Sequence, residues 1–456
     1  MKPDSDPTCR PLALAVPPEA LLLAWRDAPG LCFLDSADRG GWSLLARDPV
    51  EVVEGRHVAE RLVPDVRCGA GRSADSGPPF RSGWIGFLAY EAAPAFDPAH
   101  RTHPPEPGLP LAWWGRYAAA LAFHEPSRVW YLVHSPDALG RTAANALEAR
   151  LAESSFRSTV PGEIAIDDGV PRESTSLTRA THAERTATIL GWIARGDIYQ
   201  ANLTYRVEQS LAVDPVALYS ALRAANPAPY GAYLSPAPGL TIQSSSPELF
   251  LRVRGTAVCT RPIKGTAGRD PDNPVNDRRI AEALRASVKD RAELTMIVDL
   301  ERNDLGRVAR FGTVRVDPFP EVESYAAVHH LVAGVHADLP PGRSWFELLA
   351  ASFPGGSVTG APKIRAMEIL SELETAPRFV YTGTLGWIDD RGDGELALAI
   401  RTLWTSRGQV CFGVGGGVVA DSTAEGEWSE TEHKARALRA ALQRVARAEP
   451  QDRHYS

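Results

Sequence analysis

The chain has 456 residues, of which 44% are hydrophobic and 23% are charged. This balance is typical of a folded globular protein and excludes an intrinsically disordered chain. The formal net charge of -7 argues against a general nucleic-acid binder, which needs a basic surface.

The cysteines and the apolar runs indicate a cytoplasmic globular enzyme. The chain starts with acids, Met1 to Asp6, where a secretory signal needs bases. No apolar run approaches the roughly 20 residues of a membrane span. The cysteines are scattered without metal-ligand spacing, as expected for reduced thiols: Cys9, Cys32, Cys68, Cys259 and Cys411.

The sequence divides into two parts and a connection. Residues 12–153 contain short strand-like runs between glycines and prolines, such as Leu31–Leu34 and Val129–Val133. Residues 154–180 are rich in Ser, Pro, Asp and Glu without apolar periodicity, which predicts a linker. Residues 181–448 carry most of the motifs and are predicted to form the catalytic domain.

Apolar periodicity predicts the helices of this second part. They are expected at Ala183–Ala194, Asp277–Lys289, Trp345–Ala351, Ile364–Leu373 and Glu425–Ala448. The last is predicted to be the longest helix.

Arg261–Thr266 places Lys264 in what reads as a constrained turn, between Pro262 and Gly265. Proline fixes φ and glycine permits backbone conformations closed to other residues. If the amine is desolvated, its pKa falls and the neutral form becomes a nucleophile. An exposed turn lysine is the alternative interpretation of the hexapeptide alone.

Carboxylates gather in Asp290–Asp304 and at the start of the last predicted helix. Glu427 and Glu430 stand three residues apart, on one helix face, where two like charges repel unless a cation lies between them. Oxygen ligands without His or Cys would select a hard cation such as Mg2+. A favourable interaction with the helix dipole is the competing explanation of these acids.

Two glycine-rich stretches accompany the acids. Gly355–Lys363 precedes a predicted helix, and free backbone N–H groups there would make an anion site. Gly413–Gly417 lets backbone approach a ligand or marks a bent strand. Neither matches a nucleotide-binding motif. Arg401 follows a strand-like run and would offer a bidentate fork to a carboxylate.

Taken in order, the motifs of residues 181–442 resemble the chorismate-utilising enzymes, and within that family the aminodeoxychorismate synthase component I branch. Residues 12–153 match more loosely, chiefly at Gly83–Glu91. The segments that carry the resemblance are Gly196–Leu203, Ser246–Glu248, Arg261–Thr266, Asp290–Asp304, Val328–Leu331, Phe353–Lys363, Tyr381–Trp387, Ile400–Thr402 and Gly415–Ser422.

The resemblance implies a large α/β (α+β) sandwich of two sheets, with helices outside, an active-site cleft, and strands from both parts of the chain in one body. It also implies Mg2+-dependent amination of chorismate at C4 to 4-amino-4-deoxychorismate, through lysine attack at C2. The ammonia would come from a separate glutamine amidotransferase subunit, because no cysteine here stands in a Gly-flanked nucleophile turn.

The same resemblance assigns roles to individual residues. The catalytic set is Lys264 as nucleophile, Glu248 as the acid that protonates the leaving hydroxyl, and His330 and Thr359 beside the ring. The metal set is Glu293 and Glu430, with Glu427 nearby. The substrate-binding set is Tyr381, Arg401, Gly415, Gly416, Gly417, Lys434 and Gln200.

Two positions separate the branches of the family. Water-adding relatives place a basic lysine where this chain has Gln200, which disfavours isochorismate formation. Anthranilate synthases typically carry alanine where this chain has Lys264. Anthranilate synthase component I and a non-catalytic chorismate-binding regulatory subunit remain the alternatives. Some relatives also hold tryptophan in the N-terminal part, where Leu34–Pro49 would line the pocket.

Overall fold

A computed structural model describes residues 8–36, 41–69, 77–154, 173–317, 320–325 and 328–446. Most of the predicted linker, residues 155–172, lies outside the described residues. Of the helices that are described, none is long and apolar enough to span a membrane.

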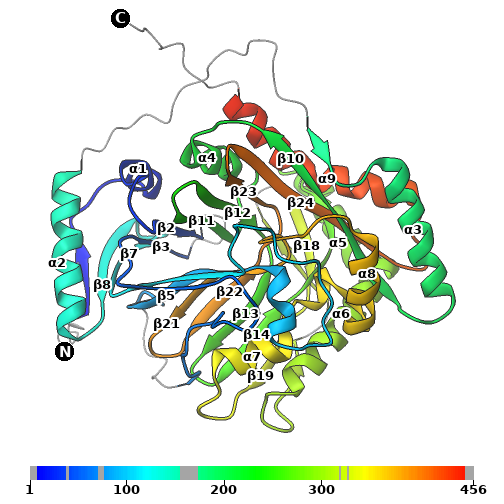
Figure 1. The fold of residues 1–456 in the computed structure, drawn as a ribbon, viewed down its shortest axis with the longest axis horizontal. Helices are drawn as coiled ribbons and strands as arrows, with labels where there is room; N and C mark the ends of the chain where they lie inside the picture. The colour runs from blue at the N-terminus through cyan, green and yellow to red at the C-terminus, as the bar shows by residue number, and fades with distance from the viewer. Residues whose placement is uncertain are drawn as a thin grey trace, which may run out of the picture.

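Two large antiparallel sheets form the body, as predicted (Figure 1). The first joins 12 described strands in the order β1 (Cys9–Leu12), β8 (Val129–His134), β7 (Ala119–His124), β3 (Trp42–Ala46), β2 (Cys32–Asp35), β11 (Tyr230–Ala237), β12 (Leu240–Ser246), β23 (Thr402–Ser406), β24 (Gln409–Val418), β10 (Gln200–Ser210) and β20 (Gly360–Ala361), with β9 (Ser174–Thr175) beside β10.

The second large sheet and a small third sheet complete the described strands. The second has nine strands in the order β16 (Arg315–Val316), β19 (Val335–Asp338), β14 (Ala257–Arg261), β13 (Leu249–Arg254), β22 (Gly394–Leu398), β21 (Thr384–Asp389), β5 (Gly83–Leu88), β6 (Ala112–Tyr117) and β4 (Glu51–Gly55). The third joins β15 (Ile263–Gly268), β18 (Val328–Val332) and β17 (Glu321–Ser324).

Both parts of the chain contribute strands to both large sheets. In the first, β2 pairs with β11, with Asp35 opposite Gly231. In the second, β5 pairs with β21, with Leu88 opposite Thr384, and Figure 1 shows the blue and orange strands side by side. The expectation of one shared body is therefore confirmed, while the boundaries at residues 153 and 181 stay a prediction.

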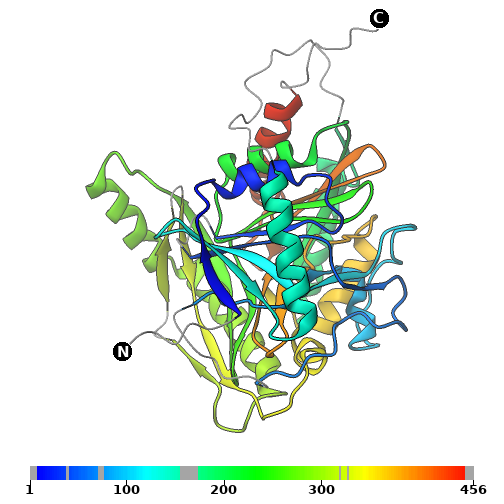
Figure 2. The same cartoon turned by 90° about the vertical axis from the view of Figure 1, so that its left-hand side faces the viewer.

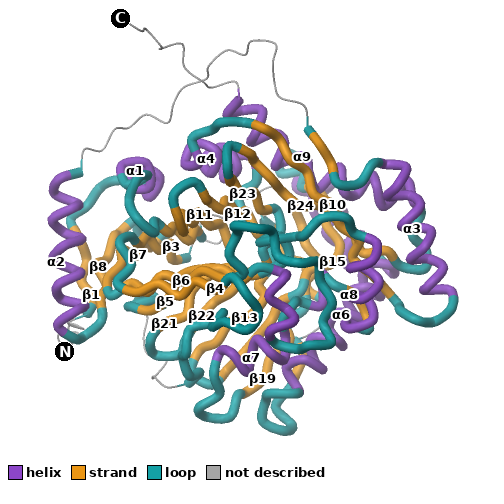
Figure 3. Tube along the Cα trace, in the orientation of Figure 1, coloured by secondary structure: helices purple, strands orange, loops and turns teal. Residues whose placement is uncertain are grey.

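Helices cover the outer faces of the sheets (Figure 3). Figure 2 shows α2 lying across the strands of the N-terminal part. The described helices are α1 (Pro18–Ala24), α2 (Ala138–Glu153), α3 (Arg179–Ala194), α4 (Pro215–Ala225), α5 (Pro274–Ala286), α6 (Val288–Gly306), α7 (Trp345–Ser352), α8 (Lys363–Leu373) and α9 (Ala424–Ala446), with short 3-10 turns η1 (Tyr90–Ala95) and η2 (Gly356–Val358).

The predicted helix Asp277–Lys289 is wrong at its end. Helix α5 ends before Ser287, and α6 begins after it. The Ser287 hydroxyl accepts the backbone N–H of Asp290 and caps the start of α6. The first predicted helix begins earlier than expected, at Arg179, because Thr178 and Thr181 form a capping box. The other helix predictions are confirmed within one or two residues; residues 447 and 448 lie outside the described part.

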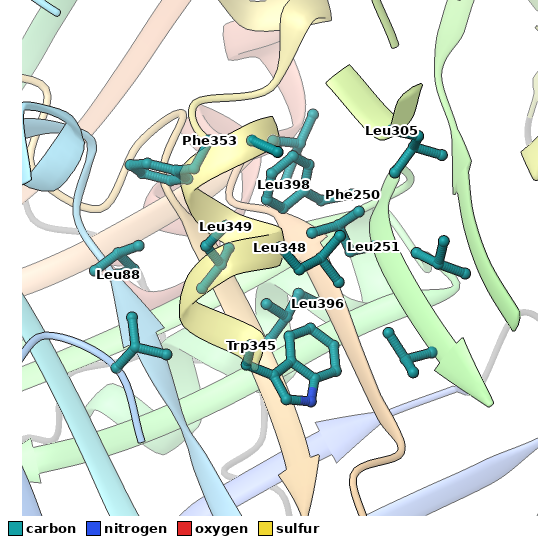
Figure 4. Close-up of a cluster of buried hydrophobic side chains, with 14 of the residues drawn as sticks. Leu88, Phe250, Leu251, Leu305, Trp345, Leu348, Leu349, Phe353, Leu396 and Leu398 are labelled. Atoms are coloured by element: carbon teal, nitrogen blue, oxygen red, sulfur yellow. The ribbon is translucent and has the colours of Figure 1, made fainter. Parts of the chain in front are cut away.

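A dry cluster between α7 and the second sheet fixes the strand ends that lead to the site (Figure 4). Each fully buried side chain of this size contributes about 1.5–3 kcal/mol. The Leu398 N–H donates to the Glu248 carbonyl at 3.1 Å, so the cluster also holds the backbone of a candidate catalytic residue. The cluster includes Trp345, Leu348, Leu349, Phe353, Phe250, Leu251, Leu396 and Leu398.

Candidate active site

The glycines of β24 form the strip on which the predicted residues converge. β24 pairs with β10 in regular antiparallel register, with Gly415, Gly416 and Gly417 opposite Thr204, Leu203 and Asn202. The alternative of a bent strand is therefore not needed to explain them. Figure 1 shows β24, β18, α6, α8 and α9 gathered on the side of the molecule away from α2.

Side chains approach this strip so closely that a Cβ would collide with them. A Cβ at Gly413 would lie 2.1 Å from the Tyr381 ring. At Gly416 it would lie 2.7 Å from Glu427 Oε2, and at Gly417 it would lie 2.9 Å from Gln200 Nε2 and 3.4 Å from Lys264 Nζ. Glycine is required here for close approach rather than for flexibility.

Lys264 lies in a strand rather than in the predicted turn. In β15 it pairs with Leu331 of β18, and the register shifts between Lys264 and Thr266. Gly265 takes up this irregularity with φ of 78°, the left-handed region that glycine tolerates. The constraint inferred from Pro262 and Gly265 is present, but a bulged sheet imposes it.

Lys264 is half-buried, and its amine is held below its ordinary pKa. Burial lowers the pKa, and the charge of Lys434 adds to this effect. The carboxylates of Glu293, Glu248 and Glu430 oppose it without overcoming it. No described carboxylate lies within ion-pair distance of the amine. The neutral, nucleophilic form is therefore more favoured than it is for an exposed lysine.

Glu248 is a buried acid in the connection between β12 and β13. The side chain is 4% exposed, and burial raises its pKa to about 7. The Ser357 hydroxyl donates to Glu248 Oε1 at 2.6 Å, and this bond and the nearby charge of Lys264 limit the rise. Such a carboxyl can hold a proton and release it near neutral pH, as general acid catalysis requires.

His330 is buried on β18, next to His329 in the same strand. Thr266 Oγ1 lies 2.9 Å from His330 Nδ1, and the ring of Tyr325 lies 5.8 Å away between centroids. Burial and the charge of Arg401 lower the pKa of His330 to about 3. The imidazole is therefore neutral at physiological pH.

The predicted metal-binding carboxylates lie on helices α6 and α9, and Glu430 is within electrostatic range of the other two. Burial raises the pKa of Glu293 and of Glu427. The charge of Glu430 on α9 raises the pKa of Glu293 on α6 and also that of Glu427. Burial opposes ionisation of Glu430 as well, but Lys434, bound at 2.7 Å, brings its pKa below the ordinary value.

Glu427 has one satisfied oxygen and one free one. The Ser422 hydroxyl donates to Oε1 at 2.6 Å, while Oε2 is buried without a hydrogen-bond partner among the described residues. Over the same residues, no group of three or more His, Cys, Asp or Glu side chains is arranged to hold a metal ion. The Mg2+ site stays a prediction, in which substrate and water oxygens would complete the ligand set.

Lys434 joins the helix group to the glycine strip. Its amine donates to the Gly415 carbonyl at 2.9 Å. Its side chain is 42% exposed, and that of Glu430 47%. The backbone of the glycine strip and this lysine therefore lie together, as the predicted binding set requires.

Thr359 and Gln200 lie at one edge of the first sheet. Thr359 is fully buried; its hydroxyl donates to the Gly355 carbonyl at 3.0 Å, and its carbonyl accepts the Asn202 N–H at 2.8 Å. Gln200 is also fully buried, and neither atom of its amide has a hydrogen-bond partner among the described residues. An unpaired buried amide is costly, and active sites are among the places where one is retained.

Tyr381 and Arg401 complete the predicted set. The Tyr381 phenol is buried, which raises its pKa, and its ring covers Gly413. Arg401 has φ of 51°, and its Nη1 donates to Asn226 Oδ1 at 3.2 Å. Burial lowers the pKa of Arg401, while the charge of Glu248 acts in the opposite direction.

Sequence reasoning missed several supporting residues. Ser357 stands inside a stretch that was interpreted only as glycine-rich, and Asn226 ends α4 without any motif. Lys363, expected beside an anion site, instead forms a buried ion pair with Asp304 at 2.7 Å and donates to the Ser352 carbonyl. The sequence signal for Ser357 is that it is a hydroxyl residue inside the matched motif Phe353–Lys363, where such a side chain can donate to a catalytic carboxyl.

The predicted tryptophan segment does line a cavity. The cavity has a volume of about 430 Å³ and lies between the two large sheets. Leu34, Asp35 and Trp42 line it from the N-terminal part, and Arg252 and Trp387 line it from the rest of the chain.

The chain is similar to known proteins over most of its length. The family model described as chorismate binding enzyme matches residues 33–440. Anthranilate synthase component 1 of Streptomyces coelicolor is 40% identical over 382 residues, which cover 81% of this chain and 75% of that protein. Aminodeoxychorismate synthase component 1 of Bacillus subtilis is 34% identical over 432 residues, covering 90% and 91%.

A solved structure agrees with these sequence relationships. Anthranilate synthase component I from Streptococcus pneumoniae superposes with a TM-score of 0.76 at 26% identity, covering 87% of this chain and 92% of that one. The resemblance inferred from the motif order is thus confirmed, since the fold and the family model agree. The chain belongs to the chorismate binding enzyme family.

Proposed function

We propose that this chain aminates chorismate at C4 to give 4-amino-4-deoxychorismate. The observation that carries the proposal is the half-buried Lys264 amine, which has a lowered pKa and lies in the electrostatic neighbourhood of Glu248, Glu293 and Glu430. A lysine so placed is suited to nucleophilic attack rather than to binding a carboxylate.

The reaction uses the Lys264 amine as nucleophile and the Glu248 carboxyl as acid. The neutral Lys264 amine adds at C2 of chorismate, and the C4 hydroxyl leaves as water with the proton of Glu248. Ammonia then adds at C4, the double bond returns to its original position, and the Lys264 amine is expelled from C2. The proton lost by the added ammonia returns to Glu248. The net change exchanges the C4 hydroxyl for an amino group and releases one water.

The carboxylates of α6 and α9 fit a hard divalent cation. Glu293 and Glu430 would hold Mg2+, with Glu427 nearby; the unpaired Glu427 Oε2 and the all-oxygen donor set support this assignment. When bound, Mg2+ would neutralise the substrate carboxylate and favour departure of the C4 oxygen. Lys434 holds Glu430 ionised and so keeps a ligand ready.

The substrate would be held by groups on the other side of the ring. Tyr381 and Arg401 would bind the enolpyruvyl carboxylate, and the N–H groups of Gly415, Gly416 and Gly417 with Lys434 would bind the ring carboxylate. His330 and Thr359 would lie beside the ring. The neutral state of His330 supports a hydrogen-bonding role rather than a charged one.

Anthranilate synthesis is the second candidate, because the relative with 40% identity is an anthranilate synthase component 1. In that reaction ammonia would add at C2 and pyruvate would leave, and Lys264 would have no covalent role. The presence of Lys264 favours the aminodeoxychorismate reaction, because anthranilate synthases typically carry alanine at this position.

The ammonia would be supplied by a separate glutamine amidotransferase. The component 1 names of the relatives support a two-component system. The described cysteines support it as well: burial raises the pKa of Cys32 and of Cys68 to about 12 and that of Cys411 to about 11, which leaves these thiols unreactive.

The test is to identify the product. The purified chain is incubated with chorismate, Mg2+ and ammonium at mildly alkaline pH, and products are measured by mass spectrometry. 4-Amino-4-deoxychorismate, converted to 4-aminobenzoate by an added lyase, supports the proposal. Anthranilate with pyruvate contradicts it in favour of the second candidate, and chorismate binding without turnover favours a non-catalytic subunit.

A further inference from the structure

We propose that Glu91, at the end of the N-terminal motif Gly83–Glu91, is a positioning residue for the chorismate site. The inference rests on the proposed function. Glu91 lies on η1, far in sequence from the predicted catalytic residues, yet its carboxylate accepts the backbone N–H groups of Arg378 at 2.7 Å and Phe379 at 2.9 Å. The Tyr90 N–H also donates to the Phe379 carbonyl at 2.8 Å.

The segment that Glu91 holds is strained and leads directly to Tyr381. Phe379 and Thr382 have φ of 54° and 61°, in the left-handed region that side chains rarely adopt. Such residues persist only when their surroundings determine the conformation, and they concentrate at functional sites. The Glu91 carboxylate is one of these determinants, because it fixes two successive N–H groups at the start of the segment.

Arg378 extends this hold to Thr359. Its guanidinium is buried and donates to the Val358 carbonyl at 2.9 Å and to the Asn202 carbonyl at 2.9 Å. Val358 precedes Thr359 in the chain, and the Asn202 N–H donates to the Thr359 carbonyl. The guanidinium also donates to Thr382 Oγ1 at 3.2 Å, and that hydroxyl donates to the Tyr381 carbonyl at 2.6 Å.

The charge of Arg378 is balanced inside the protein. Glu374 accepts two guanidinium bonds, at 2.9 and 2.6 Å, and the Tyr90 ring lies 4.3 Å from the guanidinium carbon. Glu374 in turn accepts the N–H and hydroxyl of Thr204. A buried network that is this fully bonded rigidifies its surroundings. The N-terminal motif thereby sets the relative position of Tyr381 and Thr359.

The test is Glu91→Gln in the full chain. The amide places an NH2 group against one of the two backbone donors, so the Tyr381 segment loses part of its support. We expect KM and the chorismate Kd to rise about tenfold with kcat within about threefold of the wild-type value, because a misplaced binding group weakens binding first. Thr382→Ala, which cuts the link between Arg378 and Tyr381 and leaves Glu91 intact, should raise KM about threefold.

Asp389→Asn is the matched control. Asp389, at the end of β21, is also fully buried and accepts two backbone N–H groups, from Arg81 at 2.8 Å and Arg391 at 2.9 Å. Its carboxylate bonds these two arginines rather than any predicted site residue. The substitution should lower the melting temperature without raising KM. A Glu91→Gln protein that loses thermal stability like this control, with unchanged KM and Kd, would overturn the inference.

Direct binding separates this inference from the proposed function. If the wild-type chain binds chorismate but forms another product, the proposed function fails while the Kd comparison still tests Glu91. If the wild-type chain does not bind chorismate at all, both are overturned. If it forms the expected product and the Kd of Glu91→Gln is unchanged, the positioning inference alone is wrong.

Discussion

Two groups of titratable side chains meet at the site, and the fold buries them to different degrees. The strand group consists of Glu248, Lys264 and His330. The helix group consists of Glu293, Glu427, Glu430 and Lys434. Burial acts on both, but Lys264 and His330 are driven toward their neutral forms while Glu430 is held ionised.

The difference lies in both exposure and partners, because the side chains of Glu430 and Lys434 are partly exposed whereas Glu248 and His330 are buried. Glu430 has Lys434 at 2.7 Å, one helical turn away, and this opposite charge overcomes the cost of burial. Lys264 has carboxylates within electrostatic range but, among the described residues, none in an ion pair. A buried group without a close charged partner is shifted toward its neutral form, whereas a group with such a partner keeps its charge.

The largest expected effect comes from removing the nucleophile of the strand group. Lys264→Ala should reduce kcat/KM for aminodeoxychorismate formation at least about 1,000-fold, since no other group can form the bond at C2. Lys264→Arg keeps the cation but is not a neutral nucleophile at any accessible pH, so it should be equally inactive. The measurement is steady-state kinetics with the coupled lyase.

An active Lys264→Arg protein would contradict the comparison between the two groups, because the reaction would then depend on a positive charge at this position rather than on a neutral amine. An Lys264→Ala protein with unchanged activity would remove Lys264 from the mechanism altogether. Formation of anthranilate by both variants would favour the second candidate function.

The elements of the site were predictable to different degrees. Helices α7 and α9 could be predicted because the signals for them, apolar periodicity and helix-start residues, lie within the helical segments themselves. Lys264 was predicted in a turn because Pro262 and Gly265 are local turn signals. Its actual strand is set by β18, whose partner residue Leu331 is remote in sequence.

Hydrogen bonds between residues far apart in the sequence could not be predicted from local sequence patterns. The Ser357 hydroxyl reaches Glu248 over 109 residues, and Glu91 reaches Arg378 over 287. The break between α5 and α6 was missed for a different reason. A serine such as Ser287 can cap a helix or lie within one, and tertiary packing determines which of the two occurs. The motif order could be predicted, whereas the pKa values that make the motifs reactive depend on these long-range contacts.

The next largest effect concerns the helix group. Glu430→Gln should raise the Mg2+ concentration needed for half-maximal activity about 10- to 100-fold, because one carboxylate ligand is lost. Glu425→Gln is the control, since Glu425 lies in the first turn of the same helix but pairs with Arg179 on the surface. The measurement is activity against free Mg2+ in chelator-treated protein.

An equal rise in both variants would mean that the overall charge at the start of α9, rather than Glu430 itself, attracts the ion. No rise in either would remove Glu430 from the predicted metal set. Activity that persists undiminished after chelation would contradict the Mg2+ requirement itself.

The two groups should also differ in how the same substitution changes stability. The pKa of Glu248 is about 7 when folded against an ordinary value of 4.5, so folding takes up a proton between these pH values and stability falls as pH rises through them. Glu248→Gln avoids this cost and should be about 1–3 kcal/mol more stable than the wild type at pH 7.5.

Glu430→Gln should behave in the opposite way. Its lowered pKa contributes stability above the ordinary value, and the partly exposed pair with Lys434 is worth about 0–1 kcal/mol. Thermal melts of both variants at pH 5 and 7.5 give the measurement. A Glu248→Gln protein that is no more stable than the wild type at pH 7.5 would show that Glu248 ionises freely.

The smallest effect tests the fine adjustment of the acid. The Ser357 hydroxyl donates to Glu248 and favours its charged form, so Ser357→Ala should raise the pKa of Glu248. If Glu248 must be protonated to release the C4 hydroxyl, the alkaline limb of kcat/KM should move to higher pH, by about 0.5–1 unit. Ser422→Ala removes the equivalent hydroxyl from Glu427 in the helix group and should leave that limb in place. A limb that moves in Ser422→Ala but not in Ser357→Ala would assign the proton to the helix group, and the two groups would exchange their roles.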